Sequence, residues 1–164
     1  MSEWYDRPFM GRWSVRDIVQ GQPLGHPSHA LFIHFPAGLL PAAFFLDVAS
    51  QLRPDAGLGR VAGYNIGLGL AGAVPSVLTG LVDYLGMVGG SKKKEVATRH
   101  LLAQLAALTA FSLSLLCRTR RRNPARTPAA AVVLGGVGLA ALVVGNYLGG
   151  HLVYRQGMRV STGP

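Results

Sequence analysis

Five histidines and one aspartate are the side chains of this sequence with the clearest capacity for chemistry. They are His26, His29, His34, His100, His151 and Asp83. Neutral imidazole is a ligand for haem iron, zinc and copper, and it exchanges protons near neutral pH. The sequence has no His-Glu-x-x-His pair, no nucleophile elbow and no phosphate-binding loop. These residues therefore predict ligand, proton or electron chemistry rather than hydrolysis.

Four apolar stretches must position these side chains. They cover about residues 30–48, 61–82, 101–117 and 129–153. A helix needs roughly 20 apolar residues to cross the hydrocarbon core of a bilayer, because each residue rises about 1.5 Å. Of the whole chain, 49% is hydrophobic and only 14% is charged, and the charges lie between these stretches. We therefore expect an all-α integral membrane protein, a four-helix bundle in antiparallel up-down-up-down order.

The rest of the chain divides around this bundle. Residues 1–24 alternate aromatic and charged side chains, which predicts an interfacial or mobile N-terminal segment. Residues 25–160 form the four-helix domain, and residues 161–164 are a tail. The net charge of +9 is clustered between the spans, so we expect the lipid bilayer, not nucleic acid, to supply the counter-charge.

This topology gives the molecule two ends, which we name by the segments they contain. Face A holds the N-terminus, the connection at 86–99 and the C-terminus, and face B holds the connections at 51–60 and 118–128. Nine of the 16 Lys and Arg residues fall at face A and seven at face B, so charge leaves the orientation open. All five histidines and Asp83 fall at face A. Asp47 lies near face B, where we expect it to pair with Arg60 or with amides at a span end.

The histidines predict a ligand site at face A, because facing helices of a bundle can present axial ligands to a haem. The candidate ligands are His29, His34, His100 and His151. His34 and His100 are the preferred pair, for one haem b or for a metal ion, since they can reach a similar depth. The alternative is a dry hydrogen-bond network, such as Asp83 with His100, that joins the helices without a cofactor. The single Cys117 cannot ligate an iron–sulfur cluster, so none is expected within this chain.

Glycine and proline give two further expectations about the helices. Glycines are frequent in the second and fourth spans, which predicts close helix packing. Prolines fall inside the first two spans, at Pro36, Pro41 and Pro75, where they free backbone carbonyls and favour kinks.

Several short motifs occur in a fixed order along the chain. They are Gly25-His26-Pro27-Ser28-His29, His34-Phe35-Pro36-Ala37-Gly38, Asp47, Thr79-Gly80-Leu81-Val82-Asp83-Tyr84, Arg99-His100, Leu148-Gly149-Gly150-His151-Leu152-Val153-Tyr154, Gly157 and Val160. In this order they resemble the bacterial domain-of-unknown-function family 2231 over residues 25–160. The positions that match the family pattern are His29, His34, Asp47, Asp83, His100, Gly149, Gly150 and Tyr154. The pattern is looser at His151.

The resemblance implies a predicted membrane protein, and some members of that family are joined to a Rieske-type iron–sulfur domain. Since these residues include no such domain, we expect any Rieske-type or respiratory partner to be a separate polypeptide, with a quinone as the other electron partner. The combined expectation is a multi-pass electron-transfer protein or subunit of the bacterial cytoplasmic (inner) membrane. The alternatives are a non-catalytic accessory subunit of a larger complex and a small metal-binding protein that forms a homo-oligomer. Whether it is an enzyme stays open, with a stand-alone enzyme disfavoured.

Overall fold

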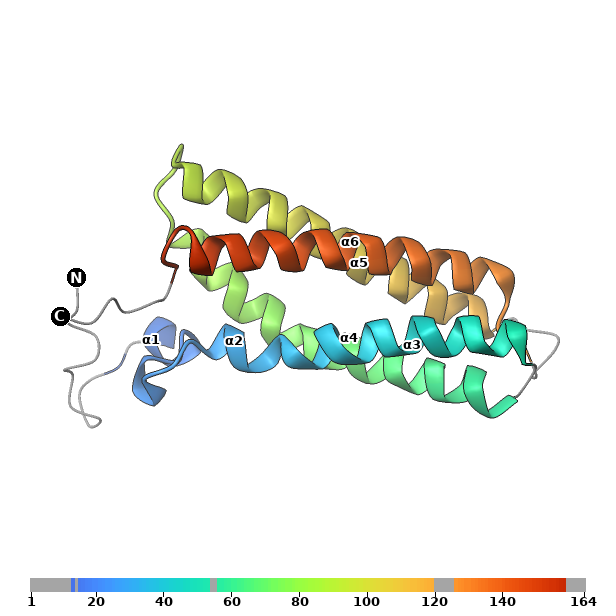
Figure 1. The fold of residues 1–164 in the computed structure, drawn as a ribbon. Coiled ribbons are helices and arrows are strands. Elements are labelled where there is room, and N and C mark those ends of the chain that lie inside the picture. The colour runs from blue at the N-terminus through green and yellow to red at the C-terminus, as the bar shows by residue number, and fades with distance from the viewer. Residues whose placement is uncertain (1–12, 14, 54–55, 120–125, 159–164) are drawn as a thin grey trace.

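The protein is entirely helical over the residues that its computed structural model describes, which are 13, 15–53, 56–119 and 126–158 (Figure 1). The elements are α1 (Val15–Val19), η1 (Gln22–Leu24), α2 (Ser28–Phe32), α3 (His34–Leu52), α4 (Ala56–Leu85), α5 (Lys92–Thr119) and α6 (Ala129–Tyr154). No strand occurs in these ranges. The all-α expectation is confirmed. The expected tail at 161–164 and most of the N-terminal segment lie outside the described residues.

Four helical units are long and apolar enough to cross a membrane. They are Ser28–Leu52, which joins α2 and α3, then Gly57–Leu85, Lys92–Thr119 and Ala129–Tyr154. The four expected spans are thus confirmed, and each extends further than its apolar core. Helix α5, for example, begins at a cap, because the Ser91 hydroxyl accepts a hydrogen bond from the Lys94 N–H at 3.2 Å.

The helices run antiparallel as two hairpins (Figure 1). Helix α3 packs mainly on α4, and α5 packs mainly on α6. Contacts between α3 and α6 and between α4 and α5 close the ring. The α2–α3 unit and α5 therefore lie diagonally across the bundle from each other.

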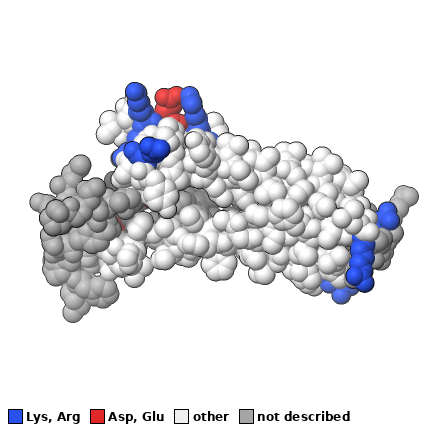
Figure 2. All heavy atoms as spheres, viewed as in Figure 1, with Lys and Arg blue, Asp and Glu red and all other residues white. Residues whose placement is uncertain are grey.

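Charge is confined to the two ends of the bundle on the side drawn in Figure 2, with an uncharged surface between them. The described Lys and Arg side chains lie at the helix ends or in the connections, at Arg53, Arg60, Lys92, Lys93, Lys94, Arg99, Arg118, Arg126 and Arg155. Many large apolar side chains are exposed along the middle of the helices, including Leu68, Val74 and Val137. An apolar belt between two charged rims is the surface that a bilayer requires.

Pro36 explains why the first span is divided into α2 and α3. Proline has no N–H, so it cannot bond to the carbonyl four residues earlier, at Phe32, where α2 ends. The helical path continues through the junction, because the Ile33 N–H bonds to the His29 carbonyl at 3.2 Å. Pro41 and Pro75 lie inside α3 and α4 without ending them.

The core occupies the middle of the bundle and draws on all four long helices. Its fully or almost fully buried members are Leu40, Ala43, Ala62, Ile66, Ala107, Phe111 and Leu142. Glycine permits its closest contacts: a Cβ added at Gly138 of α6 would lie 2.8 Å from the Phe111 ring of α5. A Cβ added at Gly69 of α4 would lie 2.8 Å from Leu40 of α3. The expectation that glycines serve close helix packing is confirmed at these positions.

Candidate functional site: two inward-facing histidines at face A

His29 faces α4 from the first turn of α2. Its Nδ1 donates to the carbonyl oxygen of Ser76 at 2.8 Å, and the hydroxyls of Ser76 and Thr79 each lie 3.5 Å from the same nitrogen. Because a carbonyl oxygen only accepts, this bond places a proton on Nδ1, so the lone pair of the neutral ring is on Nε2. The ring rests against Gly80, where an added Cβ would lie 3.0 Å from the imidazole.

His100 has the same arrangement between α5 and α6. Its Nδ1 donates to the carbonyl oxygen of Gly145 at 2.7 Å. Its ring rests against Gly149, where an added Cβ would lie 3.1 Å from Cε1. Among the described residues, Nε2 of neither His29 nor His100 has a hydrogen-bond partner. Each imidazole is thus fixed in orientation by one backbone carbonyl and one glycine, with Nε2 available.

These two histidines lie on opposite hairpins of the bundle. His29 belongs to α2 and His100 to α5, which are diagonally placed. Face A therefore contains two imidazoles that are each bonded to a neighbouring helix.

His34 does not share the inward orientation of His29, and its predicted pairing with His100 stays a prediction. The His34 side chain is exposed, and its Nδ1 lies 3.4 Å from the Leu31 carbonyl on its own helical turn. Five residues of helix rotate a side chain by about 140°, so His29 and His34 cannot both face α4. Residue depth, which favoured His34, carries no information about this angle.

The other two histidines stand apart from the pair. His26 is exposed before α2, and His151 is half-buried in the last turn of α6. Within the described ranges, no three or more His, Cys, Asp or Glu side chains are grouped so that they could hold a metal ion. The five histidines share one end of the molecule without forming a single cluster.

Asp83 is buried at the end of α4 and bonds to the N-terminal part of the chain. Its Oδ1 accepts from Nε2 of Gln20 at 3.1 Å. Nδ1 of His100 donates to the Gly145 carbonyl rather than to Asp83. Gln20 lies 63 residues before Asp83, and no pattern in the sequence links the two. Asp83 thus fastens the segment after α1 to the bundle.

Asp47 forms a buried ion pair near face B. Asp47 is 0% exposed and Arg118 is 7% exposed. Nη1 of Arg118 donates to Oδ1 of Asp47 at 2.8 Å, and Nη2 donates to Oδ2. The expected pairing with Arg60 is wrong: Arg60 is exposed on α4. Arg118, which we expected in the connection after Cys117, lies in the last turn of α5 and points into the bundle.

Hydroxyl groups complete this buried network. The Thr127 hydroxyl donates to Oδ1 of Asp47 at 2.9 Å, and the Ser50 hydroxyl donates to the Asp47 carbonyl at 2.7 Å. Nη2 of Arg118 lies 3.4 Å from the Ser114 hydroxyl. The network joins α3, α5 and the residues before α6. The serines follow from helical spacing, because Ser114 lies four residues before Arg118 and Ser50 lies three after Asp47.

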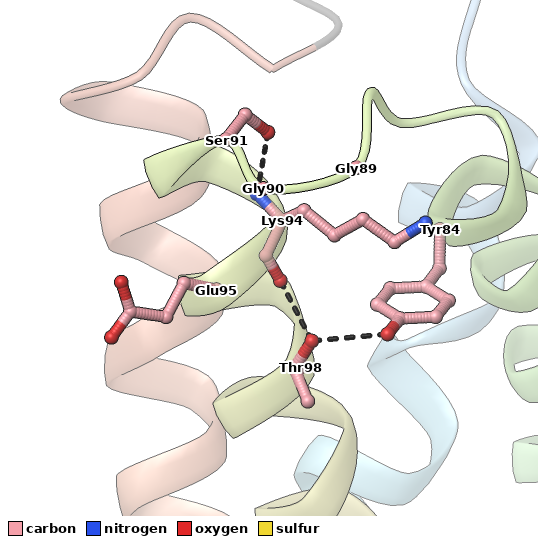
Figure 3. A pocket seen from close by; sticks show the side chains of 7 residues that line it. All are labelled: Tyr84, Gly89, Gly90, Ser91, Lys94, Glu95 and Thr98. Carbon is pink, nitrogen blue, oxygen red and sulfur yellow. Dashed lines mark hydrogen bonds between the residues drawn. The ribbon is translucent and has the colours of Figure 1, made fainter.

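A shallow pocket lies under the α4–α5 connection at face A (Figure 3). The Tyr84 hydroxyl lies 3.0 Å from Oγ1 of Thr98, and Nζ of Lys94 lies 5.0 Å from the centre of the Tyr84 ring. Lys94 also donates to the Met87 carbonyl at 3.3 Å, and Thr98 donates to the Lys94 carbonyl at 2.8 Å. These polar groups satisfy one another, so they hold the connection onto α5.

Four apolar helices, an uncharged belt and two charged rims define an integral membrane four-helix bundle. The chain belongs to the family described as Predicted membrane protein (DUF2231), whose sequence model matches residues 25–162. The resemblance noted from the motifs is thereby confirmed. No curated protein and no solved structure matches the chain. The family establishes the class of protein.

Proposed function

We propose that this chain is a membrane electron-transfer protein or subunit that holds one haem b at face A between His29 and His100. One observation carries the proposal: each Nδ1–H is bonded to a backbone carbonyl, so both Nε2 lone pairs are available from a fixed ring. Hydrogen bonds of this kind orient metal-ligating imidazoles and increase their basicity.

The donor set suits haem iron better than an isolated metal ion. Two imidazoles would suffice to hold a haem iron, whereas a structural zinc site needs four protein ligands. The two candidate ligands come from diagonally opposed helices of the bundle. The single cysteine excludes a Cys-x-x-Cys-His attachment motif, so the haem would be held without thioether bonds. When bound, haem supplies one-electron chemistry, and the protein supplies ligation and the apolar surroundings.

The proposal extends to the setting of the protein. The bacterial cytoplasmic membrane is its proposed location, with a quinone or a separate Rieske-type or respiratory protein as the electron partner. The match to a family of predicted membrane proteins and the four apolar helices support the membrane location.

A visible absorption spectrum tests the haem. The full chain, purified from cells with ample haem supply, is expected to show a Soret band that shifts on reduction with dithionite. His29→Ala and His100→Ala are each expected to lose most of the bound haem, because each removes one axial ligand. His34→Ala is the matched control, since it removes an exposed histidine of the same end. A colourless wild-type protein, or equal haem loss in the control, would contradict the proposal.

A second candidate is a non-catalytic accessory subunit of a larger membrane complex. The bonds from His29 to Ser76 and from His100 to Gly145 also join neighbouring helices, as a purely structural network does. For this candidate the purified chain is colourless and free of metal by elemental analysis, and His29→Ala lowers only its stability. Metal at about one equivalent per chain, without haem, would instead support the small metal-binding protein.

A further inference from the structure

We propose that the first turn of α5 binds the phosphate group of an anionic phospholipid at the face A rim. The binding residues are Lys92, Lys93 and Lys94, beside the pocket under the α4–α5 connection. They include neither His29 nor His100, so the lipid site does not depend on the haem. Unpaired positive charge, free hydrogen-bond donors and a position at the border of the apolar belt support it.

Three consecutive lysines begin α5 without an acidic partner. Glu95 is the one acidic residue of α5, and its carboxylate pairs with Arg99 at 2.6 Å. No salt bridge among the described residues involves Lys92, Lys93 or Lys94. Figure 2 shows basic side chains gathered at the end of the bundle where α5 begins. This rim therefore carries positive charge that the described part of the chain does not neutralise.

The start of a long helix adds to this charge. The helix macrodipole places partial positive charge at the N-terminus, so cations are disfavoured there and an anion is stabilised. The Ser91 hydroxyl bonds to the N–H of Lys94, but within the described ranges the backbone N–H groups of Lys92 and Lys93 have no hydrogen-bond partner. Free N–H donors next to ammonium groups are the donor set that a phosphate group prefers.

The pocket under the connection gives a head group access to these donors (Figure 3). Lys94 lines the pocket, and its bond to the Met87 carbonyl uses one of the three N–H donors of Nζ. Gly89 and Gly90 also line it, and a Cβ added at either would meet no atom within 4 Å. A ligand can therefore approach the Lys94 ammonium group without displacing a side chain at these two positions.

The lysines lie at the level of a phospholipid head group. They belong to the charged rim of face A, which borders the uncharged belt (Figure 2). Exposed apolar side chains occur on both sides of them along the chain, at Leu85 and Val88 before the lysines and at Leu102 after them. Head groups lie just outside the hydrocarbon core of the bilayer. A phospholipid can thus bring its phosphate to the lysines while its acyl chains cover apolar side chains.

An anionic phospholipid fits these features better than other anions. A soluble anion could bond to the same donors but would leave Leu85 and Val88 uncovered. A zwitterionic head group brings its own cation, so it would leave the charge of the three lysines uncompensated. Clusters of lysine next to a membrane span attract anionic lipids for this reason.

Native mass spectrometry of the full chain in detergent tests the proposal with phosphatidylglycerol and phosphatidylcholine of the same acyl chains. Wild type is expected to bind phosphatidylglycerol roughly tenfold more tightly. The double variant Lys92→Gln with Lys93→Gln should lose most of this preference, because each lysine near a membrane surface is worth roughly fivefold in affinity. Lys92→Arg with Lys93→Arg keeps the charge and should bind within about threefold of wild type.

Arg53→Gln with Arg60→Gln is the matched control. It removes two exposed cations from face B and should keep the preference of wild type. If the double glutamine variant fails to fold, Lys92→Gln alone decides, with an expected loss of roughly fivefold. Raising the salt concentration from about 0.1 M to about 0.5 M should weaken phosphatidylglycerol binding more in wild type than in the glutamine variants.

Three results would overturn the lipid site. They are equal binding of the two lipids by wild type, the same loss of preference in the face B control, and competition by inorganic phosphate at the concentration of the lipid. The last would assign the donors to a soluble anion. None of these results depends on the haem spectrum, because a colourless protein can still prefer phosphatidylglycerol.

Discussion

At the scale of single residues, Asp47 and Arg118 form a buried ion pair between α3 and α5. Both side chains are buried, and two parallel hydrogen bonds join the guanidinium to the carboxylate. Removing one member of a buried pair leaves an uncompensated charge in a medium of low dielectric constant. Arg118 also has a buried Nε without a hydrogen-bond partner among the described atoms. Its hydrogen bonds to Asp47 therefore come from Nη1 and Nη2.

We expect Arg118→Met to lower the free energy of unfolding by about 3–5 kcal/mol, because Asp47 is then buried without a counter-charge. The double variant Asp47→Leu with Arg118→Met should recover most of this loss, since neither charge remains. Reversible unfolding in mixed detergent measures the effect. Arg60→Met, an exposed arginine near the same end, is the control and should change stability by under about 0.5 kcal/mol. A double variant no more stable than Arg118→Met would contradict the pairing.

At the scale of helices, glycine sets how closely α6 can approach its neighbours. Gly138 touches the buried Phe111 ring, and Gly145 and Gly149 touch polar side chains of α5. In contrast, an added Cβ at Gly67 of α4 would meet no atom within 4 Å. A glycine in a span therefore marks a close contact between helices at some positions, such as Gly138, and not at others, such as Gly67.

Gly138→Ala is expected to destabilise the bundle by about 1–3 kcal/mol, because the new methyl group overpacks against Phe111. Gly67→Ala is the matched control. It should be neutral or stabilising by up to about 1 kcal/mol, since alanine has the higher helix propensity and no contact is made. Both values come from the same unfolding measurement in detergent. Equal stability of the two variants would mean that α5 and α6 do not approach as closely as the Gly138–Phe111 contact requires.

At the scale of the whole molecule, the two charged rims and the belt between them fix which segments share a side of the membrane. The α4–α5 connection and the end of α6 lie at face A, and the end of α3 lies at face B (Figure 1). The balance of basic residues leaves open which face is cytoplasmic. Which segments lie together on one side of the membrane can nevertheless be tested.

Cysteine labelling tests this arrangement in sealed membrane vesicles. In a Cys117→Ala background, Gly89→Cys and Arg155→Cys should react with an impermeant maleimide from the same side, because both are exposed at face A. Arg53→Cys should react from the opposite side only. The Cys117→Ala chain without a new cysteine is the control for background labelling. Labelling of Gly89→Cys and Arg53→Cys from one side would contradict the four-span topology.

The sequence by itself determined the four spans, their antiparallel order and the gathering of histidines at one end. These properties follow from the lengths of the apolar stretches and from the number of membrane crossings. Both can be read along the chain without knowing how the helices pack. His29 and His100 were both recognisable as candidates for the same reason.

Tertiary structure alone decided which polar side chains meet. His29 rather than His34 faces inward because of its angle on the helix, and that angle matters only once a neighbouring helix is placed. Asp47 is 71 residues from Arg118, and His100 is 45 residues from the carbonyl of Gly145. Such partners are set by the packing of apolar helices against one another, whose faces differ too little in hydrophobicity for the sequence pattern to fix their rotation.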